Sequence, residues 1–153
     1  MSKKSRELIH FKGNMMGVFD THAHLYDARF SEEGIEPDSI LERAKDAGVD
    51  KILIPADSLE TSYKAMEYAL ANNGKSGVSV YAAVGVHPHE ASKYTDQTEI
   101  ELRRLLIDRK RGQILALGEI GLDYYYDFSP REIQREVFKR QLKLAYECDV
   151  PFI

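Results

Sequence analysis

The chain has 153 residues, of which 43% are hydrophobic and 30% are charged, and its net charge is −4. This length suffices for one domain with a buried core but not for two of ordinary size. The acidic balance argues against a protein that binds nucleic acid mainly by covering its phosphates with Lys and Arg, although a bound metal ion would still allow a phosphate-bearing substrate.

The sequence contains no segment typical of a signal peptide or a membrane span. Residues 1–15 have no extended strand or helix pattern, and we expect a disordered extension there, before a domain that covers residues 16–153. The one cysteine, Cys148, excludes an internal disulfide and lies in an apolar helical pattern. It predicts a packed thiol in a reducing, cytoplasmic compartment.

Strand and helix patterns alternate along the rest of the chain. We expect strands at 17–25, 51–56, 80–88 and 114–124, and helices at 38–48, 58–74, 98–110 and 129–149. In the last helix, Ser129 is expected to act as the cap and Glu132 to complete a capping box. One apolar face of the second helix is expected to carry Leu59, Tyr63, Met66 and Leu70. The stripe of the last helix that is expected to pack on the sheet consists of Ile133, Val137, Phe138, Leu142 and Ala145.

This alternation predicts right-handed crossovers and a parallel α/β sheet. A TIM barrel and an open doubly wound sheet both satisfy the pattern, but no phosphate-binding glycine motif follows the first strand, which disfavours a nucleotide-binding open sheet. Residues 150–153 have the pattern of a fifth strand that has just begun. Four βα units are half of a (β/α)8 barrel of roughly 250 residues, so we expect a barrel truncated to about its first half.

Histidines and a carboxylate lie where three of these strands should end. His22 and His24 alternate after the first strand, His87 and His89 follow the third, and Glu119 lies in the fourth. Alternate strand residues point to one side, and the strand ends of a barrel meet at its mouth. An HxH pair alone is a weak signal and HPH can be a turn, but an acidic side chain in an apolar run is costly to bury without a cation. Together these residues favour a site for zinc, iron or manganese.

Two aspartates and three tyrosines flank these residues. Asp20, directly before the histidine pair, is expected to orient it. Asp123 is expected either to orient a ligand or to begin the next turn. The run Tyr124–Tyr126 is more typical of packing at the rim than of catalysis, with stacking on a nucleobase as the alternative.

The three motifs VFDTHAHLYD, VGVHPHEA and LGEIGLDYYYD, in this order and spacing, closely resemble the TatD family of metal-dependent hydrolases, whose members are often described as deoxyribonucleases. The resemblance runs from about Val18 to the end of the chain. It implies a TIM barrel with one or two divalent metal ions (Zn, Mg or Mn), bound by His22 and His24, with Glu119 as a further or bridging ligand. His87 and His89 are implied to contact the substrate.

For the family, the resemblance implies hydrolysis of phosphodiester bonds in DNA by metal-activated water. Its pattern continues with an HxR motif, another histidine and an aspartate, which are expected beyond Ile153. We therefore expect the 153-residue chain to be inactive by itself. Two alternatives stay open: another HxH barrel hydrolase, either an amidohydrolase or a PHP-type phosphoesterase, and a fragment that binds metal weakly or self-associates through exposed sheet edges.

Overall fold

The computed structural model describes residues 17–153, so the extension expected at 1–15 lies outside the described residues. The strands are β1 (Val18–Asp20), β2 (Val49–Pro55), β3 (Ser79–Val84) and β4 (Ile114–Leu117). The α-helices are α1 (Ala28–Glu32), α2 (Pro37–Asp46), α3 (Leu59–Asn72), α4 (Asp96–Ile107) and α5 (Arg131–Glu147), and the 3-10 helices are η1 (Lys75–Gly77) and η2 (Pro88–Lys93). Within the described range, no helix has both the length and the apolar character needed to cross a bilayer.

The sheet resolves which α/β architecture the chain adopts. Its order is β1-β2-β3-β4, and each neighbouring pair is parallel. In a doubly wound sheet the spatial order of the strands reverses at one point, because later strands are added on the other side of the first strand. In a barrel each new strand is added beside the strand that precedes it in the chain. Residues 150–153 continue the barrel order, because Phe152 forms a parallel bridge with Leu117, and the Ile153 N–H donates to the Leu117 carbonyl over 3.1 Å. The expected start of a fifth strand is therefore present beside β4.

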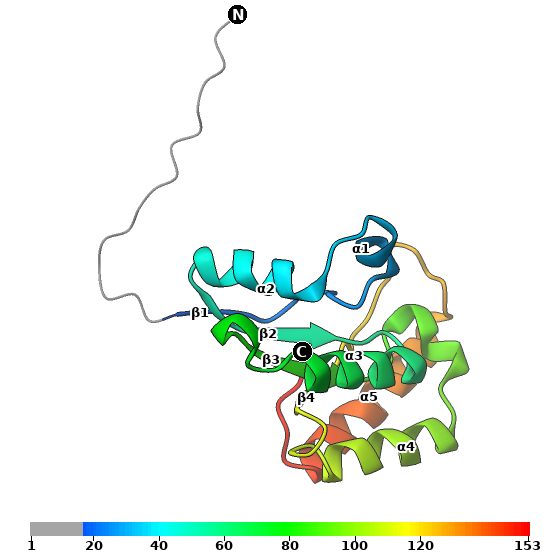
Figure 1. Ribbon diagram of the computed structural model, residues 1–153. Helices are drawn as coiled ribbons and strands as arrows, with labels where there is room; N and C mark the ends of the chain where they lie inside the picture. Colours follow the sequence, from blue (N-terminus) through cyan, green and yellow to red (C-terminus); the bar gives the residue numbers. More distant parts are fainter. Residues whose placement is uncertain (1–16) are drawn as a thin grey trace, which may run out of the picture.

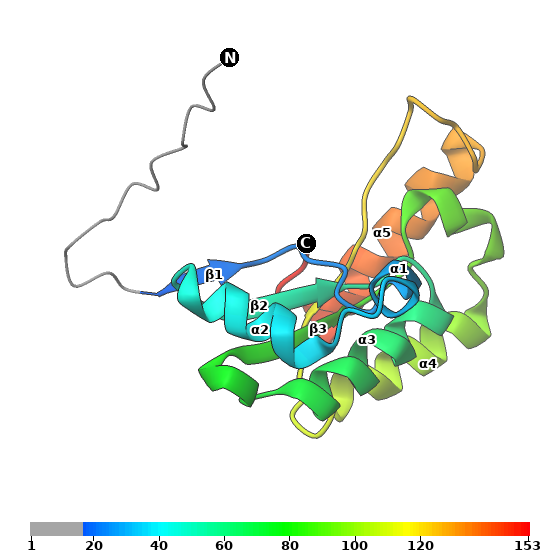
Figure 2. The same cartoon turned by 45° about the horizontal axis from the view of Figure 1, so that its top comes forward.

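The helices cover one face of the sheet, following one another in chain order (Figures 1 and 2). Successive residues of each strand point to opposite faces of the sheet. Ile54 and Val80 are buried in the main core with helix residues such as Leu102, whereas Leu53 and Ala83 belong to a smaller apolar cluster on the opposite face. Helices on one side only are typical of a barrel wall, whose other face is the barrel interior.

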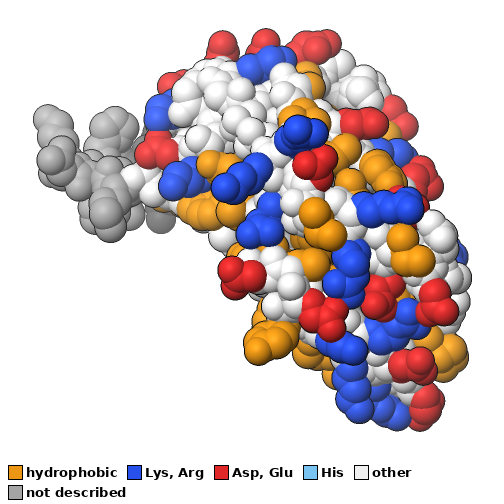
Figure 3. Space-filling view, turned by 90° about the horizontal axis from the view of Figure 1, so that it is seen from below, with side chains coloured by type: hydrophobic (Ala, Val, Ile, Leu, Met, Phe, Trp, Pro, Cys, Tyr) orange, Lys and Arg blue, Asp and Glu red, His pale blue; other side chains and the backbone are white. Residues whose placement is uncertain are grey.

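Charged side chains of both signs are mixed on the face of the molecule seen from below (Figure 3). Lys and Arg side chains alternate there with Asp and Glu, and hydrophobic groups are exposed among them. No continuous basic patch is visible on this face. The mixture agrees with the overall charge of −4.

The apolar face expected for α3 is not its most buried face, although Leu59 and Met66 of that face are half-buried and pack against the core. The buried residues of this helix are Ser62, Ala65, Ala69 and Asn72, while Leu70 is exposed. Small side chains let the helix lie close to β3: the Ser62 hydroxyl accepts from the Gly85 N–H over 3.1 Å. Close packing between backbones therefore decided which face is buried, and the larger apolar side chains lie at the edges of the contact.

The expected capping box of α5 is wrong. Pro130 is the N-cap and makes no side-chain cap, and Ser129 is fully buried. The Ser129 hydroxyl accepts from the Ser92 N–H over 3.0 Å and donates to the His89 carbonyl over 2.9 Å, so it ties the start of α5 to η2. The buried face of α5 consists of Gln134, Val137, Gln141, Leu144 and Ala145, of which only Val137 and Ala145 belonged to the expected stripe.

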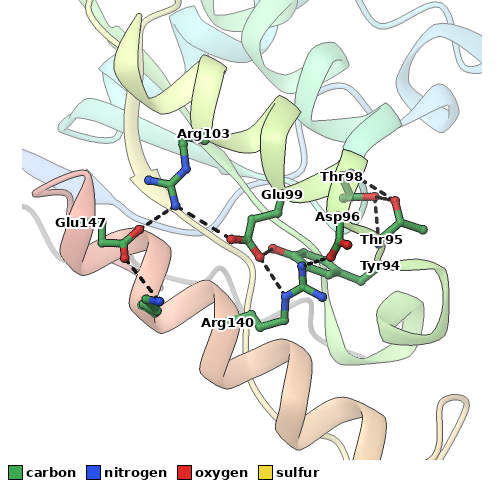
Figure 4. Close-up of polar contacts among 9 residues, drawn as sticks. Tyr94, Thr95, Asp96, Thr98, Glu99, Arg103, Arg140 and Glu147 are labelled. Carbon is green, nitrogen blue, oxygen red and sulfur yellow. Dashed lines mark hydrogen bonds and ion pairs between the residues drawn. The ribbon is translucent and has the colours of Figure 1, made fainter.

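Ion pairs join α5 to α4 and fix its position (Figure 4). Arg140 donates to Asp96 over 2.7 Å and to Glu99 over 2.8 Å, and its guanidinium lies 5.0 Å from the centre of the Tyr94 ring. At the other end of α5, Arg103 donates to Glu147 over 2.6 Å. These contacts hold α5 in place. Its buried glutamines, Gln141 and Gln134, contact the segments that follow β3 and β4.

Candidate metal centre

Two strand ends deliver imidazole and carboxylate groups to one place. The Nε2 atoms of His22 and His24, which follow β1, lie 3.2 Å apart. They are 3.5 and 3.8 Å from Oε2 of Glu119, which follows β4. One ligand atom from each of these three residues lies within 4.8 Å of the other two. The three predicted ligands therefore come together in space.

The histidine pair is held in place by its own backbone. The Ala23 N–H donates to the Leu53 carbonyl over 3.2 Å, which continues the contact with β2 beyond the last residue of β1. The Nε2 atoms of the two rings, 3.2 Å apart, both reach the same side of this segment. Asp20 contributes by accepting from the His22 N–H over 3.0 Å, so it orients the backbone rather than an imidazole ring.

Glu119 is positioned by a close approach of two glycines. The Glu119 N–H donates to the Ala56 carbonyl over 2.7 Å, and the preceding Gly118 N–H donates to the Val84 carbonyl over 2.9 Å. A Cβ on Gly85 would lie only 2.9 Å from the Gly118 carbonyl carbon. The glycine at position 85 therefore lets the segments after β3 and β4 come together, which brings His87 near Glu119.

His87 approaches the carboxylate from the other side, with its Nε2 3.6 Å from Glu119 Oε1. Its N–H donates to the Asp57 carbonyl over 2.8 Å, and its Nδ1 accepts from the His89 N–H over 3.1 Å. Burial lowers the pKa of His87, outweighing the opposing effect of the Glu119 charge, and favours the neutral ring. Because Nδ1 is an acceptor, the proton of that neutral ring lies on Nε2, which faces the centre as a donor.

His89 turns away from the three candidate ligands. Its Nε2 contacts the Asp123 carboxylate, and this hydrogen bond lowers the pKa of Asp123 to about 2. The other carboxylate oxygen accepts from the N–H groups of Tyr125 and Tyr126 over 2.8 and 3.1 Å. Asp123 therefore begins the turn, as one alternative drawn from the sequence expected, and it also orients His89, which is not one of the three candidate ligands.

Two buried glutamines of α5 hold the loops that carry the site, and neither was predicted from the sequence. Gln141 accepts from the Val86 N–H and donates to the Val86 carbonyl, both over 2.9 Å, directly before His87. Gln134 makes the same double contact with Asp123, over 2.8 and 2.9 Å. Their seven-residue spacing places them on one helix face, a signal that could have identified them.

Asp57, which follows β2, is a further residue missed from the sequence. With His24, His87, His89, Glu90 and Glu119 it lines a cavity of about 250 Å³. Its carboxylate accepts from the Thr61 hydroxyl over 2.7 Å at the start of α3. An aspartate directly after a buried strand is the same signal that singled out the other strand ends, and it could have found this one.

The donor set fits a divalent cation. Two imidazole nitrogens and a carboxylate oxygen suit zinc, manganese or iron. Among residues 17–153, Glu119 forms ion-pair contacts only with histidines and with no Lys or Arg, so its charge has no permanent cationic partner in the described part of the chain. His22, His24 and Glu119 would hold the ion, and His87 would flank it.

Comparisons with known proteins show which family the chain belongs to. A family model described as "TatD related DNase" matches residues 19–153. The chain is 36% identical to the uncharacterized metal-dependent hydrolase YabD of Bacillus subtilis, over 89% of this chain and 49% of that protein. It is 34% identical to the 3'-5' ssDNA/RNA exonuclease TatD of Cronobacter sakazakii, over 88% of this chain and 47% of that protein.

Solved structures give the same result. The TatD homolog YJJV of Escherichia coli K12 matches with a TM-score of 0.71 and 36% identity, over 88% of this chain and 48% of that one. A TatD family hydrolase of Entamoeba histolytica matches with a TM-score of 0.77 and 27% identity, over 89% and 48%. The chain spans about half the length of the relatives it matches. With this match over nearly all described residues, the chain belongs to the TatD family, and its fold is that of the first half of a TIM-barrel hydrolase.

Proposed function

We propose that this chain supplies the metal-binding part of a hydrolase that cleaves phosphodiester bonds in nucleic acid, with a DNA strand as the expected substrate. The observation that carries the proposal is the convergence of His22, His24 and Glu119 at the carboxyl ends of the strands. The names of relatives support it, since one is a metal-dependent hydrolase and another an exonuclease acting on single-stranded DNA and RNA.

The residues of the centre have distinct proposed roles. His22, His24 and Glu119 bind a divalent cation, which supplies Lewis acidity and a nucleophile at neutral pH. With two imidazoles among three ligands, zinc or manganese is favoured over magnesium, which prefers oxygen ligands. His87 donates from Nε2 toward a phosphoryl oxygen, a role that suits its neutral ring. His89, oriented by Asp123, contacts the strand beside it.

The proposal is tested with the 153-residue chain itself. Mn²⁺ and Zn²⁺ are titrated by calorimetry, and a labelled single-stranded oligonucleotide is incubated with the metal-loaded chain. We expect saturable metal binding that is lost in His22→Ala. Metal-dependent cleavage would extend the proposal to catalysis by this chain alone, whereas binding without cleavage would restrict it to metal binding. Absence of metal binding would refute it.

Self-association through the sheet edges stays a prediction. Val18 and Phe19 of β1 are exposed at one edge of the sheet, and Phe152 is exposed at the other. Exposed edges of this kind favour pairing with another chain. Sedimentation velocity over a range of concentrations tests the prediction, and a monomer at all concentrations would contradict it.

A further inference from the structure

We propose that the segment between β4 and α5 carries a nucleobase-binding platform, made by Tyr125, Tyr126 and Phe128, that receives an unpaired base of the strand held at the candidate metal centre. The inference rests on the proposed function and adds to it a base-binding site beside the candidate metal centre. Figure 2 shows this segment, in yellow-orange, extending well beyond the strand ends before α5 begins.

The three aromatic side chains of the platform are unusually exposed. Tyr125 is 86% exposed, Tyr126 is 59% exposed and Phe128 is 68% exposed. The sequence favoured packing of Tyr124–Tyr126 at the rim of the site, and such packing would have buried Tyr125 and Tyr126. Exposed aromatic groups gathered in one place are typical of a binding surface.

The rings are arranged for stacking. Tyr126 and Phe128 lie nearly parallel, with 19° between their planes and 5.4 Å between their centres. Tyr125 meets Tyr126 edge-on at 4.8 Å. A planar base placed on the outer face of this pair extends the stack, which is how aromatic side chains bind single-stranded nucleic acid without reading its sequence.

The platform is held in place before any ligand arrives. Arg131 donates to the Asp127 carboxylate over 2.6 Å and to the Tyr124 carbonyl over 3.2 Å. Asp123 accepts from the N–H groups of Tyr125 and Tyr126. A fixed loop loses little conformational entropy when a ligand binds, so the stacking contributes more of its energy to affinity.

The platform is continuous with the candidate metal centre. One pocket of about 470 Å³ is lined by His87 and Glu119 together with Tyr124 and Tyr125. The centres of the His87 and His89 rings are 4.3 Å apart, and the His89 ring lies edge-on to Phe128 at 4.8 Å. A strand with a phosphate beside Glu119 therefore has a neighbouring base at the platform.

The chemistry of the platform favours an unpaired base over other occupants. Its contact groups are flat aromatic faces rather than the aliphatic side chains that dominate most apolar surfaces. In a duplex the faces of the bases are covered by their neighbours, so only a single strand or a frayed end offers a free face.

The test compares strands with and without bases. Binding of a short labelled oligothymidine, and of an abasic strand of equal length, is measured by fluorescence anisotropy with Mn²⁺ present, and strand integrity is checked after each titration. Tyr126→Leu and Phe128→Leu remove the aromatic face but keep apolar bulk. Tyr146→Leu is the matched control, because Tyr146 is 88% exposed but lies at the far end of α5, a helix of 17 residues and about 25 Å.

We expect each platform variant to weaken binding of oligothymidine about fivefold to hundredfold, to leave the abasic strand unaffected, and Tyr146→Leu to change neither. Equal binding of both strands by the unmodified chain, unchanged binding in the variants, or no binding at all would overturn the platform. Loss of self-association in the variants without an effect on oligothymidine would overturn it in favour of a second copy of the chain. Saturable Mn²⁺ binding in calorimetry, measured on the same variants, distinguishes failure of the platform from failure of the proposed function.

Discussion

Replacing Gln141 by leucine tests how strongly α5 holds the loop that precedes His87. Gln141 is only 1% exposed and satisfies both backbone groups of Val86, which is itself buried. Leucine leaves the Val86 N–H and carbonyl without these partners, at a cost of about 1–3 kcal/mol for each group. Burial of the apolar leucine side chain offsets about 1–2 kcal/mol. The free energy of unfolding should therefore fall by about 2–4 kcal/mol.

Urea denaturation followed by circular dichroism measures this loss. With a slope of about 1–3 kcal/mol per molar urea, the midpoint should fall by about 1–2 M. Gln97→Leu is the control, because Gln97 is an exposed helical glutamine whose single contact is with Glu101, and its effect should stay within about 0.5 kcal/mol. Equal midpoints for Gln141→Leu and the unmodified chain would refute the claim that this contact holds the loop.

Three further changes test other contacts. Gly85→Ala places a Cβ 2.9 Å from the Gly118 backbone and should destabilise the chain by about 1–3 kcal/mol in urea unfolding, so an unchanged midpoint would contradict the close approach. The folded-state pKa of Asp123 is about 2, below its ordinary value of 3.8, so its contribution to stability is present above pH 3.8 and is lost as the pH falls toward 2. Asp123→Asn should therefore reduce the loss of stability in acid. An acid profile identical to that of the unmodified chain would argue against the pair with His89. Arg140→Met should lower the free energy of unfolding by about 1–2 kcal/mol, because it removes two ion pairs and a contact with the Tyr94 ring. Arg111→Met, which removes one exposed ion-pair contact of 3.8 Å, should change the free energy of unfolding little. Equal effects of the two variants would show that the contacts between α4 and α5 add nothing to stability.

The order of strands and helices could be predicted because each element carries its own local pattern. Apolar runs such as 51–56 indicate strands buried on both faces, and helical spacing with capping residues indicates the helices between them. The parallel sheet and the convergence of His22, His24 and Glu119 then follow from the rule that strand ends meet at one mouth. Helix α1 was not predicted, because its five residues are too few to show a period.

The failures all concern contacts between elements distant in the sequence. The most buried face of α3 differs from the expected apolar face, because close approach to Gly85 favours Ser62 over larger apolar groups. Ser129 has the local signature of a helix cap, yet it bonds backbone groups of η2. The burial of Gln141 depends on Val86, which is 55 residues away. No local pattern encodes such partners, so polar residues that support a site are the hardest to find from sequence.

The proposed roles of the site residues depend first on whether the three converging side chains bind a metal ion. Calorimetric titration of Mn²⁺ into the 153-residue chain and into Glu119→Gln tests this most directly, with Glu60→Gln as a control, since Glu60 is an exposed helical glutamate that pairs with Lys64. We predict saturable binding that is weakened at least about tenfold by Glu119→Gln. Loss of a residue that only hydrogen-bonds to a metal ligand already lowers metal affinity by about 10–100-fold. Glu60→Gln should bind like the unmodified chain. No binding, or equal binding by all three proteins, would contradict a metal centre at these strand ends.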